Sequence, residues 1–265
     1  MPKNAAAQDA SVIDVVIFDG DASLADTGEL HRQSYNLAFR DLGVAWEWTA
    51  SFFARLPDAP TPQEKLRHYA RNFDPSGSLG ASSVLDHIAT VKENYFAQMI
   101  ENGSAALRPG VARLIRDART RQIPIAIAAL APRQNFEHLL QRQFGVDALA
   151  LFDAVISRGQ VAPQAGWNAA FSGAMAAGGW RPARSVAITG TANSAAAARD
   201  IGITTIATPG IYARHGDFGA ANLTISDLGQ PSAPFQVIAG DPAGHGHITP
   251  DALCALIRRD ERQVA

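Results

Sequence analysis

The sequence has few of the features that mark secreted, membrane or nucleic-acid-binding proteins. Cys254 is the single cysteine among 265 residues, so no disulfide can form within the chain, and a reducing compartment fits. The first residues lack the apolar centre of a signal peptide, and no apolar run approaches the roughly 18 residues of a membrane-spanning helix. A formal net charge of −2 gives no electrostatic footprint for nucleic acid or an anionic membrane. We therefore expect a cytoplasmic protein with neither partner.

The chain does contain 47% hydrophobic residues, enough for one large core and a smaller accessory domain. Short β-like apolar runs alternate with helical stretches, a pattern typical of a parallel sheet covered on both faces. The runs span residues 12–18, 123–128, 154–156, 185–188, 204–207 and 223–225. The sequence therefore predicts an α/β fold with a doubly wound parallel sheet.

The stretch between the first two runs has helical periodicity and no strand signal, over roughly a hundred residues, which is too long for an ordinary crossover. We predict an inserted α-helical cap at residues 31–104, and an α/β core formed by residues 1–30 and 105–265. The predicted cap helices cover residues 30–42, 63–72 and 83–102. A cap inserted after the first strand would close over the end of that strand and exclude water.

Two carboxylates, Asp19 and Asp21, directly follow the first apolar run. Open α/β sheets bind ligands at the carboxyl ends of their strands, so we expect the pair to lie in a ligand site. One carboxylate of such a pair can attack a phosphorus centre while the other exchanges a proton with the leaving group. A divalent cation can bridge both to the phosphate. The pair therefore indicates phosphoryl-transfer chemistry and a candidate metal site.

The chain resembles the haloacid dehalogenase (HAD)-like hydrolase superfamily, and within it the CbbY-like sugar-phosphate phosphatases. The resemblance spans nearly the whole chain and is carried by residues 18–21, 24–27, 31–39, 46–48, 135–140, 208–209, 217–223 and 227–231. It implies that Asp19 is the nucleophile that forms an aspartyl-phosphate and that Asp21 is the general acid/base. It also implies Mg²⁺ held by Asp19, by the backbone carbonyl of Asp21 and by an acidic residue after a later strand. His31 matches a family position that faces the site; a surface or capping role is the equal alternative.

Several positions depart from the family pattern. Ala129 stands where the family has a phosphate-binding Ser or Thr, and Gln160 stands where it has a phosphate-binding lysine. An amide can donate hydrogen bonds but brings no positive charge. Thr189 and Gly190 stand where an acidic pair completes the family's metal site, and Ala22 stands where the family has glycine.

Positive charge near the predicted site comes from other residues. The cap loop that reads Gly-Gly-Lys-Glu-Arg in the family reads Thr-Pro-Gln-Glu-Lys here, and Lys65 keeps a charge. Arg133 and Arg158 flank the substituted phosphate-binding positions and could supply charge, although a solvated loop side chain is the simpler interpretation of each. The candidate substrate-binding residues are His31, Lys65, Arg133 and Gln160.

Losing one preorganised electrostatic donor commonly costs about 10²- to 10³-fold in turnover, and a metal supplies several kcal/mol. We therefore predict a CbbY-like phosphatase homologue with impaired catalysis, a pseudophosphatase that binds a phosphorylated sugar or another anion. Substitution of the acidic ligands weakens the case for Mg²⁺. The alternative is an active Mg²⁺-dependent phosphatase of small sugar (bis)phosphates. A dehalogenase is disfavoured because that branch uses the lysine, and no repeat or low-complexity arm supports a purely structural protein.

Overall fold

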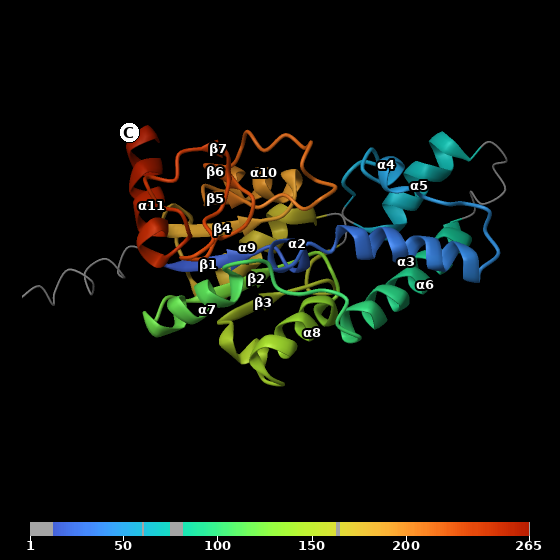
Figure 1. Ribbon diagram of the computed structural model, residues 1–265, viewed down its shortest axis with the longest axis horizontal. Helices are drawn as coiled ribbons and strands as arrows, with labels where there is room; N and C mark the ends of the chain where they lie inside the picture. The colour runs from blue at the N-terminus through green and yellow to red at the C-terminus, as the bar shows by residue number, and fades with distance from the viewer. Residues whose placement is uncertain (1–12, 60, 75–81, 163–164, 265) are drawn as a thin grey trace, which may run out of the picture.

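A sheet of seven strands forms the centre of the core in the computed structural model, which describes residues 13–59, 61–74, 82–162 and 165–264 (Figure 1). The strands are β1 (Val15–Phe18), β2 (Ile125–Ala128), β3 (Ala154–Ile156), β4 (Ser185–Thr189), β5 (Thr204–Ala207), β6 (Leu223–Ile225) and β7 (Val237–Gly240). Their order is β3-β2-β1-β4-β5-β6-β7, and every neighbouring pair is parallel except β6 with β7. The predicted α/β fold with a parallel sheet is confirmed.

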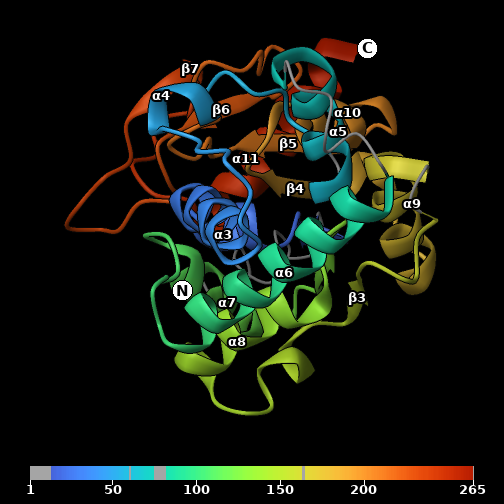
Figure 2. The ribbon, with the colours of Figure 1, turned by 90° about the vertical axis from the view of Figure 1, so that its right-hand side faces the viewer.

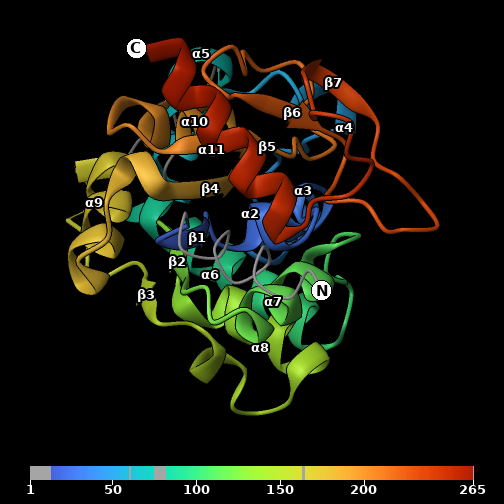
Figure 3. The ribbon, with the colours of Figure 1, turned by 90° about the vertical axis from the view of Figure 1, so that its left-hand side faces the viewer.

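Helices cover both faces of this sheet (Figure 3). One face packs against α7 (Val111–Thr120), α8 (Arg133–Phe144) and α11 (Pro250–Val264), and the other against α9 (Gly166–Gly178) and α10 (Ala192–Asp200). Successive residues of a strand point to opposite faces, so in β1 Val16 and Phe18 join the first apolar cluster while Val15 and Ile17 join the second. Because both faces are buried, β1 is apolar without interruption, and this made it recognisable in the sequence.

Strand β7 was not predicted. It pairs antiparallel with β6 at the edge of the sheet, and all four of its residues are exposed. Val237 and Ile238 keep 46% and 58% of their surface accessible. A four-residue run that faces solvent on both sides lacks the alternation and the continuous burial that identify a strand.

Four helices of the predicted cap follow β1 and the one-turn helix α2 (Asp21–Leu24). They are α3 (Gly28–Asp41), α4 (Ala50–Phe53), α5 (Pro62–Phe73) and α6 (Ser82–Glu101), and Figure 2 views the molecule from their side. Their side chains and those of the loop between α3 and α4 form an apolar cluster that includes Tyr35 of α3 and Trp48 of the loop, whose ring centroids lie 4.5 Å apart. This separate cluster fits an inserted cap, and the boundaries at 31 and 104 stay a prediction. No helix in the described ranges combines the length and the apolar character needed to cross a membrane.

Candidate functional site

A cavity of about 420 Å³ lies between the core and the helices α3 to α6. Asp19 and Gly190 line it from the carboxyl ends of β1 and β4, and His31 and Lys65 line it from α3 and α5. The structure therefore brings three of the predicted site residues, Asp19, His31 and Lys65, to one cavity. The side chain of Asp21 lies outside the described parts of the chain. The size suits a small metabolite.

The backbone turns sharply after β1, and Gly20 makes the turn possible. Its φ of +93° is in the left-handed region, which favours glycine. A Cβ at this position would lie 2.8 Å from the Cβ of Ala129, so the two loops also need glycine for their close approach. The turn places Asp19 at the floor of the cavity with 2% of its surface accessible.

Three donors among the described residues bind the carboxylate of Asp19. Its Oδ1 accepts a hydrogen bond from the backbone N–H of Ser23 at 3.0 Å. Its Oδ2 accepts from the N–H of Gly190 at 2.7 Å and from the hydroxyl of Ser194 at 2.6 Å. Ser194 is fully buried in the first turn of α10. The predicted nucleophile is therefore tied to both the β1–α2 turn and the β4–α10 turn.

The two substituted phosphate-binding positions offer no donor to the cavity. Ala129 is completely buried, and its N–H donates to the carbonyl of Ile156 at 2.9 Å. The side-chain oxygen of Gln160 accepts from the N–H and the hydroxyl of Ser157, at 3.0 and 3.1 Å. The side-chain oxygen of Gln160 is thus used in hydrogen bonds within its own loop, and Gln160 is not among the described residues that line the cavity.

Lys65 enters the cavity from α5. Its ammonium donates to the carbonyl of Pro57 at 2.7 Å and lies 5.2 Å from the ring centroid of Phe53. Burial lowers the pKa of Lys65, and the nearby carboxylate of Asp58 opposes the effect.

Lys92 is a cavity residue that the sequence analysis missed. Only 2% of its surface is accessible, and its Nζ lies 2.8 Å from Nδ1 of His31. The rings of His31 and Phe96 stack at a centroid distance of 4.0 Å, and the Lys92 ammonium lies 4.7 Å from the centroid of the Phe96 ring. A signal did exist, because Lys92 interrupts the otherwise apolar buried stripe of α6. A lysine on that stripe is either paired or functional.

The two candidate arginines lie in different places. Arg158, after β3, lines the cavity, pairs with Glu93 of α6, and donates to the carbonyl of Leu130 at 3.2 Å. Arg133 is 56% exposed and pairs with Glu137 of its own helix at 3.5 Å. Arg133 is not among the described residues that line the cavity.

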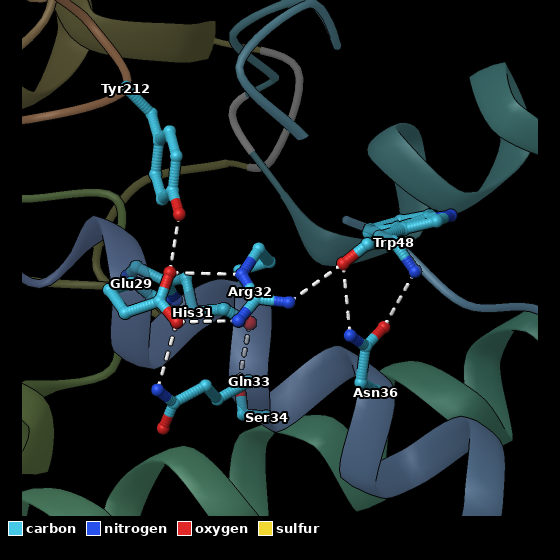
Figure 4. A network of polar contacts seen from close by, with 8 residues as sticks. All are labelled: Glu29, His31, Arg32, Gln33, Ser34, Asn36, Trp48 and Tyr212. Carbon is cyan, nitrogen blue, oxygen red and sulfur yellow. Dashed lines mark hydrogen bonds and ion pairs between the residues drawn. The ribbon is translucent and has the colours of Figure 1, made fainter. Parts of the chain in front are cut away.

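A polar network at the start of α3 connects the cap to the loop after β5 (Figure 4). Glu29 accepts hydrogen bonds from Arg32 at 2.9 Å and from the hydroxyl of Tyr212, and Asp26 accepts from the N–H of Ile211 at 2.9 Å. The guanidinium of Arg32, assisted by the Tyr212 hydroxyl, lowers the pKa of Glu29 to about 2 against the opposing effect of burial. No sequence pattern indicated a role for Tyr212, because it meets Glu29 only in the folded chain.

The described side chains around Asp19 do not fit the magnesium ion that the resemblance implies. Mg²⁺ requires oxygen ligands at about 2.0–2.1 Å in octahedral geometry. Oδ2 of Asp19 already accepts two hydrogen bonds, Gly190 has no side chain, and the hydroxyl of Thr189 points to the carbonyl of Ile206 at 3.4 Å. In the part of the chain that the structure describes, no three His, Cys, Asp or Glu side chains gather as metal ligands do.

The fold and this capped site define the class of protein. The family model described as haloacid dehalogenase-like hydrolase matches residues 16–208, and the chain belongs to that family. It is 33% identical over 222 residues to protein CbbY of Cupriavidus necator, covering 83% of this chain and 87% of the relative. It is 30% identical over 219 residues to protein CbbY of Cereibacter sphaeroides, covering 83% and 94%. Within the family, the chain is therefore a homologue of the CbbY proteins.

Solved structures support the same relationship to the CbbY proteins. CbbY from Rhodobacter sphaeroides in complex with phosphate superposes with a TM-score of 0.71 at 29% identity, over 81% of this chain and 94% of that one. A mutant of the same protein in complex with xylulose 1,5-bisphosphate gives a TM-score of 0.73 at 28% identity, over 83% and 98%. The predicted membership of the HAD superfamily and its CbbY-like branch is confirmed.

Proposed function

We propose that this chain is a cytoplasmic CbbY-like protein that binds a small phosphorylated or otherwise anionic metabolite beneath its cap and does not hydrolyse it efficiently. The observation that carries the proposal is the pair of substituted phosphate-binding positions. Ala129 is a buried methyl group and Gln160 is turned onto Ser157, so neither supplies a donor or a charge to a phosphoryl group. Preorganised donors of this kind provide much of the transition-state stabilisation in such sites.

Retained binding is supported by the cap side of the cavity. Lys65, Lys92 and Arg158 all line it, and a phosphate or carboxylate can be recognised by such cations without any bond being broken. The CbbY of Rhodobacter sphaeroides binds phosphate, and a mutant of it binds xylulose 1,5-bisphosphate. Small sugar phosphates and bisphosphates are therefore the first ligands to test.

The test combines turnover with binding. Phosphate release is measured from an aryl phosphate and from a panel of sugar phosphates that includes xylulose 1,5-bisphosphate, with Mg²⁺ or with EDTA. The CbbY of Cupriavidus necator serves as the reference and Asp19→Asn as the matched control. Binding of inorganic phosphate and of the same panel is measured by calorimetry in EDTA. We expect turnover at least about 10³-fold below the reference, as the loss of two or more donors implies, together with saturable binding.

Turnover that requires both Mg²⁺ and Asp19 would contradict the proposal and establish the alternative, an active Mg²⁺-dependent phosphatase that works through an aspartyl-phosphate. Absence of both turnover and binding in folded protein would remove the ligand-binding half of the proposal. Metal-independent release of phosphate that survives Asp19→Asn would point to contamination and is excluded by repeating the assay on protein from a second purification.

A further inference from the structure

We infer that the Asp19 site of this chain is closed to divalent cations, and that Ser194 and the contact between Ala22 and Gly190 are the features that close it. The inference rests on the proposed function and deepens it, because a site without a cation must bind its anion through the protein alone. Besides lacking acidic ligands, the site has groups that occupy a coordination position on Asp19 and the space beside Gly190.

Ser194 occupies a position on Oδ2 of Asp19 that a cation would need. Each carboxylate oxygen has about two lone-pair positions, and Oδ2 of Asp19 fills them with the N–H of Gly190 at 2.7 Å and the hydroxyl of Ser194 at 2.6 Å. A cation on Oδ2 would have to displace the Ser194 hydroxyl. That hydroxyl is fully buried and lies 3.2 Å from Oγ1 of Thr191 and 3.0 Å from the Thr191 carbonyl oxygen, its alternative acceptor. Displacing it from Asp19 would therefore exchange a hydrogen bond to a carboxylate for one to a neutral carbonyl.

Ala22 occupies the space that a side chain at position 190 would need. A Cβ built on Gly190 would lie 2.6 Å from the Cβ of Ala22, 2.7 Å from its carbonyl carbon and 2.8 Å from its carbonyl oxygen. Each distance is below any ordinary carbon contact, and two of the three atoms are backbone. No side chain therefore fits at position 190 unless the β1–α2 turn moves, and a carboxylate cannot be restored there by substitution of Gly190 alone.

The two features are independent, so removing one leaves the other in place. Replacing Ser194 by alanine frees a lone pair of Oδ2 but adds no second ligand. Replacing Gly190 by aspartate adds a ligand but drives its Cβ into Ala22. Replacing Ala22 by glycine removes the methyl group and lets the turn shift, because glycine relaxes the backbone restriction. We expect a cation site only when all three changes are combined.

The experiment measures metal binding without any substrate. Mn²⁺ is titrated into the full chain and free Mn²⁺ is followed by electron paramagnetic resonance, with Mg²⁺ calorimetry as a second readout. We expect no saturable site in the unmodified protein and one saturable site in Ala22→Gly/Gly190→Asp/Ser194→Ala. Its affinity should exceed the weak background binding of the unmodified protein by at least about tenfold, a gain of the size that groups around metal ligands commonly contribute. Adding Asp19→Asn to the triple variant is the matched control and should abolish the gain.

The single substitutions test the contact directly. Gly190→Asp should lower the melting temperature more than the pair Ala22→Gly/Gly190→Asp does, because only the pair relieves the methyl contact. One equivalent of Mn²⁺ bound by the unmodified protein and lost in Asp19→Asn would overturn the inference, even if phosphate turnover were absent. A folded triple variant without the gain would also overturn it. Mn²⁺ binding tests only this inference, whereas phosphate turnover tests the proposed function. Failure of the one can therefore be told from failure of the other.

Discussion

Lys92 shows how one residue can serve both the interior of the cap and the cavity. Its ammonium lies among the rings of His31, Tyr35 and Phe96, and its backbone belongs to the buried stripe of α6. Burying a charged group is costly unless other groups compensate it. A position that keeps lysine under those conditions is well suited to meet a negatively charged ligand.

We expect Lys92→Met to weaken binding of inorganic phosphate by about tenfold or more, the usual effect of losing a hydrogen bond to a charged group. Methionine retains the length and the apolar packing of the side chain, so the melting temperature should not fall. Calorimetry in EDTA measures the affinity. Arg133→Met, at an exposed position paired with Glu137, is the matched control and should bind as the unmodified protein does. Equal affinity of the two variants would contradict a ligand role for Lys92.

Glu29 makes the stability of the fold depend on pH, and the direction of the effect follows from its pKa. Its pKa falls from an ordinary 4.5 to about 2 in the folded protein, with Arg32 as the main cause. A carboxyl with a lowered folded-state pKa stabilises the fold above the unfolded-state value and loses that contribution as the pH falls through the folded-state value. The contribution should therefore decline between about pH 4.5 and about pH 2.

Urea unfolding of the unmodified protein and of Glu29→Gln at about pH 6 and about pH 3 checks this sign. The unmodified protein should be the more stable at the higher pH, and its advantage should shrink at the lower pH. Other carboxylates with lowered pKa values, such as Asp14 and Asp251, are present in both proteins, so they affect both alike. An advantage that stays constant over this range would contradict the assignment.

At the scale of the elements, the cap and the core meet through groups that come from loops. The loop after β5 sends Tyr212 to Glu29 and stacks its ring edge-on against Phe53, at a centroid distance of 5.2 Å. The loop after β3 sends Arg158 to Glu93. These contacts border the cavity, so movement of the cap away from the core has to break them.

Tyr212→Phe should loosen this junction without disturbing its packing. The ring against Phe53 is kept and the hydrogen bond to Glu29 is lost, so we expect a stability loss of about 1 kcal/mol. Hydrogen exchange should accelerate in the first turn of α3, where Glu29 lies, and mass spectrometry can follow it. Tyr95→Phe, on α6 and outside the Glu29 network, is the control. Unchanged exchange at α3 in folded Tyr212→Phe would show that this bond does not hold the cap.

At the scale of the whole molecule, sequence patterns predicted what is local or repeated. Strands β1 and β2 are continuous apolar runs, and Asp19 was identified because it follows the first of them. The exposed edge strand β7 has no such pattern. Ser194 could not be found in this way, because its hydroxyl meets Asp19 across 175 positions of the chain. Tyr212 also reaches Glu29 only through the packing of separate elements, whereas Lys92 left a local signal as the one charged residue on the buried stripe of α6.

The contact between Ala22 and Gly190 also bears on how this site can change over generations. A lineage that first regained an acidic side chain at position 190 would carry a steric conflict with the turn after β1. A lineage that first regained glycine at position 22 would obtain a looser turn and no new ligand. On the inference that the Asp19 site is closed, neither single change improves cation binding, so selection for a cation site has no favourable first step. The closure inferred for the cation site is in this sense hard to reverse by single point mutations.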